Sequence, residues 1–275
     1  MPNRPIFITD LDHTFLRTDQ TVSDFSAEVW NKKAKHSILS VATARSFQKS
    51  QDFLSKLHLS APMILLDGTM IVSPEKKLID VKTVNKALGD AIISEGKKFD
   101  IYPFVITLND LKTLDESFLF PTSLNTHQHG VLENYRNDPR MVKCHDIRAK
   151  EMNLKLVYFG DFKTLKPLTE HLSKTFGEVL EYKLSPEKYS DGWFLTVLHP
   201  EGDKAHALNK VMEYIGRETK DVTVFGDSMN DIGMFKLAGT SVAVSNALDE
   251  VKEVASIVLP HSNDEDAVAK YLQSV

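Results

Sequence analysis

The chain has 275 residues, of which 42% are apolar and 26% charged, values close to the average for globular proteins that leave enough apolar side chains for a sizeable core. The net charge of −5 and the lack of a dense Lys and Arg run argue against a nucleic-acid partner. No apolar run reaches the roughly 18 residues needed to span a bilayer, and the single cysteine excludes an intrachain disulfide. We therefore expect a cytoplasmic protein without a membrane partner, and the length favours two domains or one domain with a large insertion.

Short aliphatic runs recur near both ends of the chain and are typical of buried parallel strands. Helical patterns separate them, for example at 25–33 and 207–215. This alternation predicts an α/β fold, with a doubly wound, mainly parallel Rossmann-like sheet. The runs cover residues 6–8, 38–42, 63–66, 222–225, 242–244 and 257–259.

The middle of the chain has β-like runs without regular helical spacers, which predicts a smaller α+β domain inserted into the α/β core. We expect the inserted domain at 82–190 and the core at 1–81 and 191–275, with a hairpin turn at 73–77 before the first boundary. Two helices are expected in the insertion, at 83–95 and 162–176. The β-like runs are 101–108, 154–159 and 179–184, with 193–198 just beyond the insertion.

Two carboxylates follow the first predicted strand. Asp10 and Asp12 are two positions apart and precede Thr14, so they emerge at the carboxyl edge of the sheet, where open α/β sheets bind ligands. Two carboxylates on one face repel each other unless a cation or a proton separates them. The pair therefore indicates a metal site or a protonated acid, although Asp-x-Asp can also simply begin a polar loop.

Two further segments offer groups for an anion. Thr43 ends the second predicted strand, and a helix expected to open at Ala44 would present free backbone N–H groups. Lys204 opens another predicted helix, where a cation opposes the partial positive charge of the helix N-terminus unless an anion is bound. Taken singly, the first could be an ordinary helix start and the second a solvated lysine.

A fourth segment combines acidic and amide side chains after the strand at 222–225. Asp227, Asn230 and Asp231 lie within five positions, and such hard oxygen ligands suit Mg²⁺. Asp, Ser and Asn also favour turns and helix N-caps, so this segment alone could be structural. Its position at the same sheet edge as Asp10 favours the metal interpretation.

These four segments, 10–14, Thr43, Lys204 and 226–231, resemble in order the four motifs of the haloacid dehalogenase superfamily. The insertion resembles the C2-type cap of the Cof-like sugar phosphatases, so the similarity covers nearly the whole chain. Two positions depart from the family pattern. His13 stands where the family usually has Gly, and Asp67-Gly68 stands where it usually has Asn-Gly.

The resemblance implies an Mg²⁺-dependent phosphatase in which Asp10 attacks phosphorus and becomes an aspartyl-phosphate. Asp12 would protonate the leaving alkoxide and then deprotonate water, which requires a protonated Asp12 before the first step. By the same resemblance, Asp10, the backbone carbonyl of Asp12 and Asp227 hold Mg²⁺, and Asp231 positions coordinated water or Lys204. The implied catalytic residues are Asp10, Asp12, Thr43 and Lys204, the phosphate-binding residues Thr43, Ala44, Lys204 and Asn230, and the metal-site residues Asp10, Asp12, Asp227 and Asp231.

The expected partner is a small phosphorylated metabolite, with sugar phosphates favoured, and the chain would act as a monomer or homodimer. The alternatives are a phosphomutase of the same superfamily that uses the same aspartate, and a catalytically silent sugar-phosphate sensor or interaction protein. Within the insertion, His127 and His129 have the alternate spacing that would place both on one strand face near a metal or phosphate. They could equally be loop histidines, since two ligands fall short of a typical zinc site.

Overall fold

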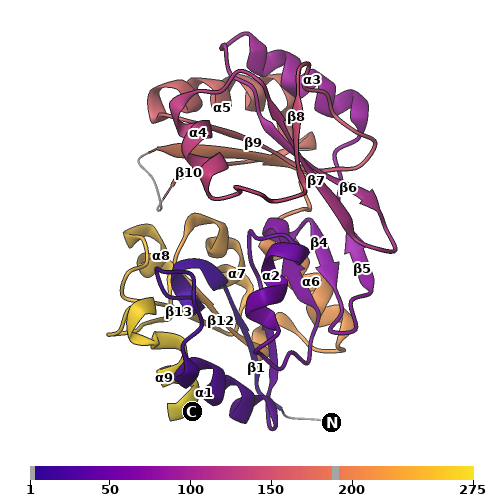
Figure 1. Cartoon of the computed structure of the whole chain (residues 1–275). Helices are drawn as coiled ribbons and strands as arrows, with labels where there is room; N and C mark the ends of the chain where they lie inside the picture. Colours follow the sequence, from indigo (N-terminus) through magenta and orange to yellow (C-terminus); the bar gives the residue numbers. More distant parts are fainter. Residues whose placement is uncertain (1–3, 188–191) are drawn as a thin grey trace. The chain divides into compact units, whose positions relative to one another are not determined.

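The computed structural model describes residues 4–187 and 192–275 and divides the chain into two compact units (Figure 1). The first unit comprises Met1–Asp80 and Asp203–Val275, and the second comprises Val81–Gly202. The second boundary expected from the sequence, at 190 and 191, lies outside the described residues. The next strand pairs within the second unit, which therefore continues to Gly202.

The first unit is built on a parallel sheet, and its strand order places the chemistry. β1 lies between β12 and β2, so the chain leaves β1 toward one side of the sheet and leaves β12 toward the other. This is a topological switch point, where the carboxyl ends of neighbouring strands open a crevice. In spatial order the strands are β14 (Ile257–Val258), β13 (Thr240–Ala243), β12 (Val222–Gly226), β1 (Ile6–Thr9) and β2 (Ile38–Val41).

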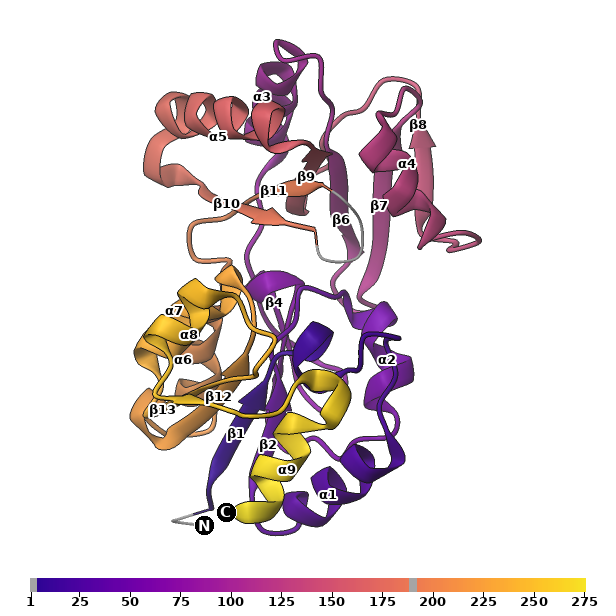
Figure 2. The ribbon, with the colours of Figure 1, turned by 90° about the vertical axis from the view of Figure 1, so that its left-hand side faces the viewer.

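Helices accompany this sheet (Figure 2), with α1 packed against α9 and α6 against α7. Side-chain N-caps fix several of the helix starts, as sequence rules require. The Ser23 hydroxyl accepts from the Ser26 N–H at the start of α1, and the Asp203 carboxylate accepts from the His206 N–H at the start of α6. The helices are α1 (Asp24–Ala34), α2 (Phe47–Leu54), α6 (Lys204–Tyr214), α7 (Ile232–Leu237), α8 (Asp249–Val254) and α9 (Ala267–Ser274).

Two of the expected parallel strands behave differently. The run at 63–66 forms β3 (Met63–Leu65), which pairs antiparallel with β4 (Met70–Val72) and touches the parallel sheet through one bridge, between Ala42 and Ile64. β4 is followed, through the predicted turn at 73–77, by β5 (Leu78–Val81). β14 pairs parallel with β13, but it is the edge strand of the sheet and both of its residues are exposed rather than buried.

The second unit is a mainly antiparallel sheet with an apolar core between one sheet face and helices α3 and α5. Leu156, Leu168 and Leu195 are fully buried in this core, and burying one such side chain stabilises a fold by about 1.5 to 3 kcal/mol. The strands, in spatial order, are β10 (Glu181–Pro186), β11 (Trp193–Leu198), β9 (Asn153–Gly160), β6 (Phe104–Asp110), β7 (Asp115–Pro121) and β8 (Met141–Cys144), and the helices are α3 (Lys86–Lys97), α4 (Thr126–Glu133) and α5 (Phe162–Phe176).

The predicted fold class is confirmed: a parallel α/β sheet is joined to an additional α+β unit. Element α4 overturns one local expectation. His127 and His129 lie on this helix, where residues two positions apart point to nearly opposite sides, so they do not share a strand face. In the described chain, no helix is both long enough and apolar enough to cross a membrane.

Candidate active site

Asp10 lies at the switch point, immediately after β1. Its backbone N–H donates to the Phe225 carbonyl of β12 (3.0 Å), which joins the two strand ends. The chain then forms a π-helical turn, Leu11–Phe15, closed by the Leu16 N–H on the Leu11 carbonyl (2.8 Å). Because the strand ends at Thr9, Asp10 and Asp12 do not continue along one strand face as the simplest sequence pattern suggests.

Lys204 is the central cation of the site. Its Nζ donates to Asp10 Oδ1 and to Asp231 Oδ1, both at 2.8 Å, and its side chain is fully buried. Two carboxylates thus offset the unfavourable position of a lysine in the first turn of α6. The sequence indicated an anion at this place, and the structure supplies it from the protein itself. Asp10 Oδ2 accepts no hydrogen bond from any described residue.

The segment after β12 completes an acidic cluster. Asp231 Oδ2 accepts from the backbone N–H groups of Asp227 (3.0 Å) and Ser228 (3.1 Å), so protein donors engage both Asp231 oxygens. Asp227 Oδ1 accepts from the Thr14 hydroxyl (2.9 Å). Gly226 makes this tight turn possible, because a Cβ there would lie only 2.5 Å from Asp231 Cγ.

Burial and charge imbalance dominate the electrostatics of this cluster. Burial raises the pKa of Asp10, and the neighbouring carboxylates add to the rise, while Lys204 opposes it. Burial alone would lower the pKa of Lys204, but Asp10 and Asp231 raise it above its ordinary value, so the ammonium stays charged. Three buried carboxylates therefore face one buried ammonium.

This donor set fits a divalent cation. One carboxylate oxygen from each of Asp10, Asp227 and Asp231 lies within 4.8 Å of the others, and all three residues are buried. Oxygen donors with excess negative charge are the ligands that hard cations such as Mg²⁺ prefer. Asp12 was expected in the metal set through its backbone carbonyl, and its side chain is not part of this cluster.

Arg45 engages the Asp12 side chain instead. Its Nε and Nη2 contact the two carboxylate oxygens at 2.8 and 2.6 Å, and Nη2 also donates to Gln20 Oε1 (2.9 Å). The guanidinium stacks over the Phe53 ring, 4.6 Å from its centroid. This bidentate pair stabilises the ionised form of Asp12, whereas the sequence analysis expected a protonated acid. Arg45 falls in the helix that the sequence predicted to open at Ala44, so its contact with Asp12 was missed.

The Thr43 segment is a loop rather than a helix start. α2 begins at Phe47 with Ser46 as its N-cap, so Ala44 and Arg45 precede the helix that was expected to open at Ala44. Thr43 is fully buried, and its hydroxyl accepts from the Arg45 N–H (3.1 Å). Its carbonyl accepts from the Asp67 N–H (3.0 Å), which connects this loop to the turn after β3.

Asp67 and Asn230 form another contact that sequence reasoning missed. Asn230 Nδ2 donates to Asp67 Oδ1 (2.9 Å), across 163 positions of the chain. Gly68 follows with φ +117°, and a Cβ at this position would lie 2.1 Å from the Asp203 carbonyl oxygen, just before Lys204. Only glycine permits that approach. The departure of Asp67-Gly68 from the family pattern marked this place in the sequence, but not its partner.

His13 adopts a left-handed backbone conformation with φ 55°. A non-glycine residue costs roughly 1 kcal/mol or more in this region, which explains why the haloacid dehalogenase pattern usually has Gly here. The Asn246 side chain holds the conformation by donating to the His13 carbonyl (2.8 Å) and accepting from the Asn263 N–H (3.0 Å). These two bonds hold the His13 backbone in its strained conformation.

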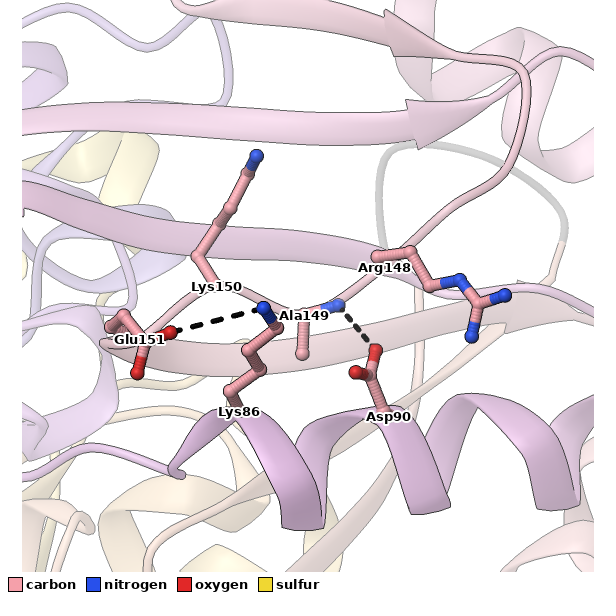
Figure 3. A pocket seen from close by; sticks show the side chains of 6 residues that line it. All are labelled: Lys86, Asp90, Arg148, Ala149, Lys150 and Glu151. Carbon is pink, nitrogen blue, oxygen red and sulfur yellow. Dashed lines mark hydrogen bonds and ion pairs between the residues drawn. The ribbon is translucent and has the colours of Figure 1, made fainter.

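A separate groove of about 430 Å³ lies in the second unit (Figure 3) and contains none of these residues. Its carboxylates already have partners: Glu151 pairs with Lys86 at 3.9 Å, and Asp90 accepts from the Ala149 N–H at 2.9 Å. Its mixed charges and ordinary contacts give it no evident chemistry. The lining residues are Lys86, Asp90, Arg148, Ala149, Lys150 and Glu151.

Known proteins resemble this chain over nearly its whole length. A family model described as haloacid dehalogenase-like hydrolase matches residues 7–272. The 5-amino-6-(5-phospho-D-ribitylamino)uracil phosphatase YitU of Bacillus subtilis is 24% identical over 298 residues, covering 99% of this chain and 98% of its own. The pyridoxal phosphate phosphatase YbhA of Escherichia coli is 26% identical over 280 residues, covering 98% and 97%. A haloacid dehalogenase-like hydrolase structure from Bacteroides thetaiotaomicron superposes with a TM-score of 0.80 at 20% identity, covering 99% of both chains.

Proposed function

We propose, because this chain belongs to the haloacid dehalogenase-like hydrolase family, that its strand-end site hydrolyses small phosphate monoesters with Mg²⁺ and through an aspartyl-phosphate. The chain is a phosphatase of this family that acts on small phosphate substrates. The observation that carries the mechanism is the buried Asp10, with one oxygen held by Lys204 and the other without a protein donor in the described chain. That second oxygen is the nucleophile in our proposal.

In the first step, a bond forms between an Asp10 carboxylate oxygen and phosphorus while the ester P–O bond breaks. Asp12 gives its proton to the departing alkoxide, and in the second step it takes a proton from the water that attacks phosphorus. The Asp10–phosphorus bond then breaks and inorganic phosphate leaves. The pairing of the Asp12 carboxylate with Arg45 favours its ionised form, which suits the second step. For the first step, the carboxylate must take up a proton, so the pair with Arg45 must loosen.

Asp10, Asp227 and the backbone carbonyl of Asp12 would hold Mg²⁺, which supplies positive charge for the phosphoryl oxygens when it is bound. Asp231 acts indirectly in this proposal, because Lys204 and two backbone N–H groups already occupy its oxygens. Its role is to fix Lys204 and the turn that carries Asp227. Thr43, Ala44, Lys204 and Asn230 remain the proposed contacts of the substrate phosphate.

The second unit, Val81–Gly202, is proposed as a C2-type cap that selects the leaving group. YitU is named for a phosphorylated ribityl compound and YbhA for pyridoxal phosphate, and both names describe a phosphate on a small polar metabolite. We therefore propose small organic phosphates, sugar phosphates among them, as substrates. We also propose a cytoplasmic monomer or homodimer.

The test is release of inorganic phosphate from p-nitrophenyl phosphate and a panel of sugar phosphates, with and without Mg²⁺, for the wild type and Asp10→Asn. We expect Mg²⁺-dependent release that falls at least about a thousandfold in the variant, because its amide is a poor nucleophile. Thermal melting of the two proteins controls for folding. A folded wild type that releases no phosphate from any ester, or a variant with near-normal turnover, would contradict the proposal. Transfer of phosphate to a second sugar position without release would indicate the mutase.

A further inference from the structure

Asp67 is a buried carboxylate at a position where the haloacid dehalogenase pattern usually has an asparagine. It is 5% exposed and lies in a turn that makes three contacts with other segments. The Leu66 N–H donates to the Arg45 carbonyl and the Asp67 N–H to the Thr43 carbonyl, both at 3.0 Å, and Gly68 packs against the Asp203 carbonyl. The turn thus joins the loop after β2 to the start of α6. Leu66 and Asp67 both have left-handed backbone conformations, with φ 51° and 65°.

The Asp67 carboxylate determines which way the Asn230 amide faces. Nδ2 of an asparagine can only donate hydrogen bonds, and an ionised carboxylate can only accept them. With Asp67 Oδ1 at 2.9 Å from Nδ2, the reversed amide would place two acceptor oxygens against each other. An asparagine at position 67 could bond to either end of the amide, so it would not impose one orientation. Asp67 therefore fixes one orientation of the Asn230 amide, whereas the asparagine usual in the family would allow both.

In this orientation Asn230 Oδ1 lacks a hydrogen-bond donor in the described chain. The atom is buried and accepts no hydrogen bond from any described residue. A buried carbonyl oxygen without a donor costs about 1 to 3 kcal/mol, so it is retained where a ligand supplies the missing partner. Asn230 also directly precedes Asp231, which holds Lys204. The missing partner should therefore arrive when the phosphatase site is occupied.

We propose that Asp67 is a positioning residue of the phosphatase site, which turns Asn230 Oδ1 toward a partner that arrives with the ligands. The partner is either the divalent cation with its water or a hydroxyl of the protonated phosphate, since both can satisfy a carbonyl oxygen. The inference rests on the proposed function, and it changes the expected role of Asn230. In this chain Asn230 serves as an acceptor as well as a contact for phosphate oxygens.

Calorimetric titrations test this without turnover. Mg²⁺ alone is titrated into the protein, and then inorganic phosphate in the presence of Mg²⁺, for the wild type, Asp67→Asn, Asn230→Ala and the double variant. We expect Asp67→Asn to weaken one of the two affinities by roughly three- to tenfold, because the amide at position 67 can itself donate to Oδ1. Loss of Mg²⁺ affinity identifies the cation as the partner, and loss of phosphate affinity alone identifies the phosphate hydroxyl.

The double variant separates positioning from a simple structural role. If Asp67 acts through Asn230, the double variant binds no worse than Asn230→Ala, because the second change removes an interaction already lost. Asp249→Asn is the matched control, since it removes one exposed carboxylate of the same unit and should change neither affinity. Unchanged affinities in Asp67→Asn, effects that add in the double variant, or a loss confined to melting temperature would each overturn the inference.

The same proteins keep this inference distinct from the proposed function. KM and kcat for p-nitrophenyl phosphate are measured beside the titrations, and we expect Asp67→Asn to change KM or the Mg²⁺ requirement more than kcat. A wild type that binds Mg²⁺ and phosphate but releases no phosphate from esters would remove the proposed function. The difference in Mg²⁺ or phosphate affinity between the wild type and Asp67→Asn would still decide whether Asp67 positions Asn230.

Discussion

In the first unit a buried lysine reaches a carboxylate from a distant part of the chain, whereas the buried arginine of the second unit pairs with carboxylates no more than 24 positions away. Lys204 bonds to Asp10 across 194 positions and to Asp231 across 27. Arg140 of the second unit pairs with Glu116 across 24 positions and with Asp138 across two. The first cluster lies at strand ends, and the second is an ion-pair network that joins β7 to the turn before β8.

The two clusters differ in how their buried charges are satisfied. A buried charge is costly unless partners satisfy it, so a structural network gathers enough partners from its own surroundings. In the Asp10, Asp227 and Asp231 cluster, the Lys204 ammonium pairs with Asp10 and Asp231, and one oxygen from each of the three carboxylates lies close enough to the others to hold a metal ion. A buried group of carboxylates of this kind is typical of sites where a ligand completes the structure.

The largest effect is expected from Lys204→Met, which removes the ammonium between Asp10 and Asp231. We expect turnover of p-nitrophenyl phosphate to fall by at least about a thousandfold, and the free energy of unfolding by about 3 to 5 kcal/mol. Saturating Mg²⁺ should restore part of the stability, because in the proposed site it binds Asp10, one of the two carboxylates that lose the ammonium. Lys210→Met, which removes an exposed lysine of the same helix, is the control for both measurements. Loss of less than tenfold in turnover would mean that the cluster does not act as proposed.

A smaller effect, confined to stability, is expected from Arg140→Met in the second unit. Glu116, whose side chain is fully buried, and Asp138 would each lose a guanidinium contact, at a cost of about 3 kcal/mol. Urea unfolding would be followed by Trp193 fluorescence in a Trp30→Phe background, so that the signal comes from the second unit. The exposed Arg136→Met should change stability by less than about 1 kcal/mol. If Arg140→Met weakened Mg²⁺ binding instead, the contrast between the units would fail.

Within the second unit, the strength of the local sequence pattern decided which elements could be predicted. Regular elements with strong patterns were predicted closely, such as α5, whose N-cap Asp161 and following Gly177 mark both ends. β7 and α4 were missed. β7 begins with Asp115-Glu116-Ser117, and α4 contains His, Gln and Gly, so tertiary packing rather than local propensity decides these elements.

The site shows the same division between local pattern and tertiary contact. Asp10, Lys204, Asp227 and Asp231 stand in recognisable motifs, and the structure brings them together at the switch point. The roles of those residues and of Thr43 and Asn230 remain proposals. The Arg45–Asp12 pair could not be read from sequence, because it joins two loops across 33 positions, and no periodic pattern records such a contact.

The smallest effect is expected from Asp266→Asn. This substitution changes a carboxylate of the first unit whose two oxygens both accept hydrogen bonds from protein groups. Burial alone would raise the pKa of Asp266, but hydrogen bonds from Arg17, Ser23 and Ser26 outweigh burial and hold it below the ordinary value. The charged form is therefore favoured in the folded state, so its contribution is present above about pH 4 and is lost as pH falls through the lower folded-state pKa. Asparagine tolerates the left-handed conformation at this position (φ 59°), so the substitution reports mainly on charge. We expect a loss of about 1 to 2 kcal/mol at pH 7 by urea unfolding, and a gap between wild type and variant that narrows below pH 4. A gap independent of pH would show that the hydrogen bonds, and not the charge, carry the stabilisation.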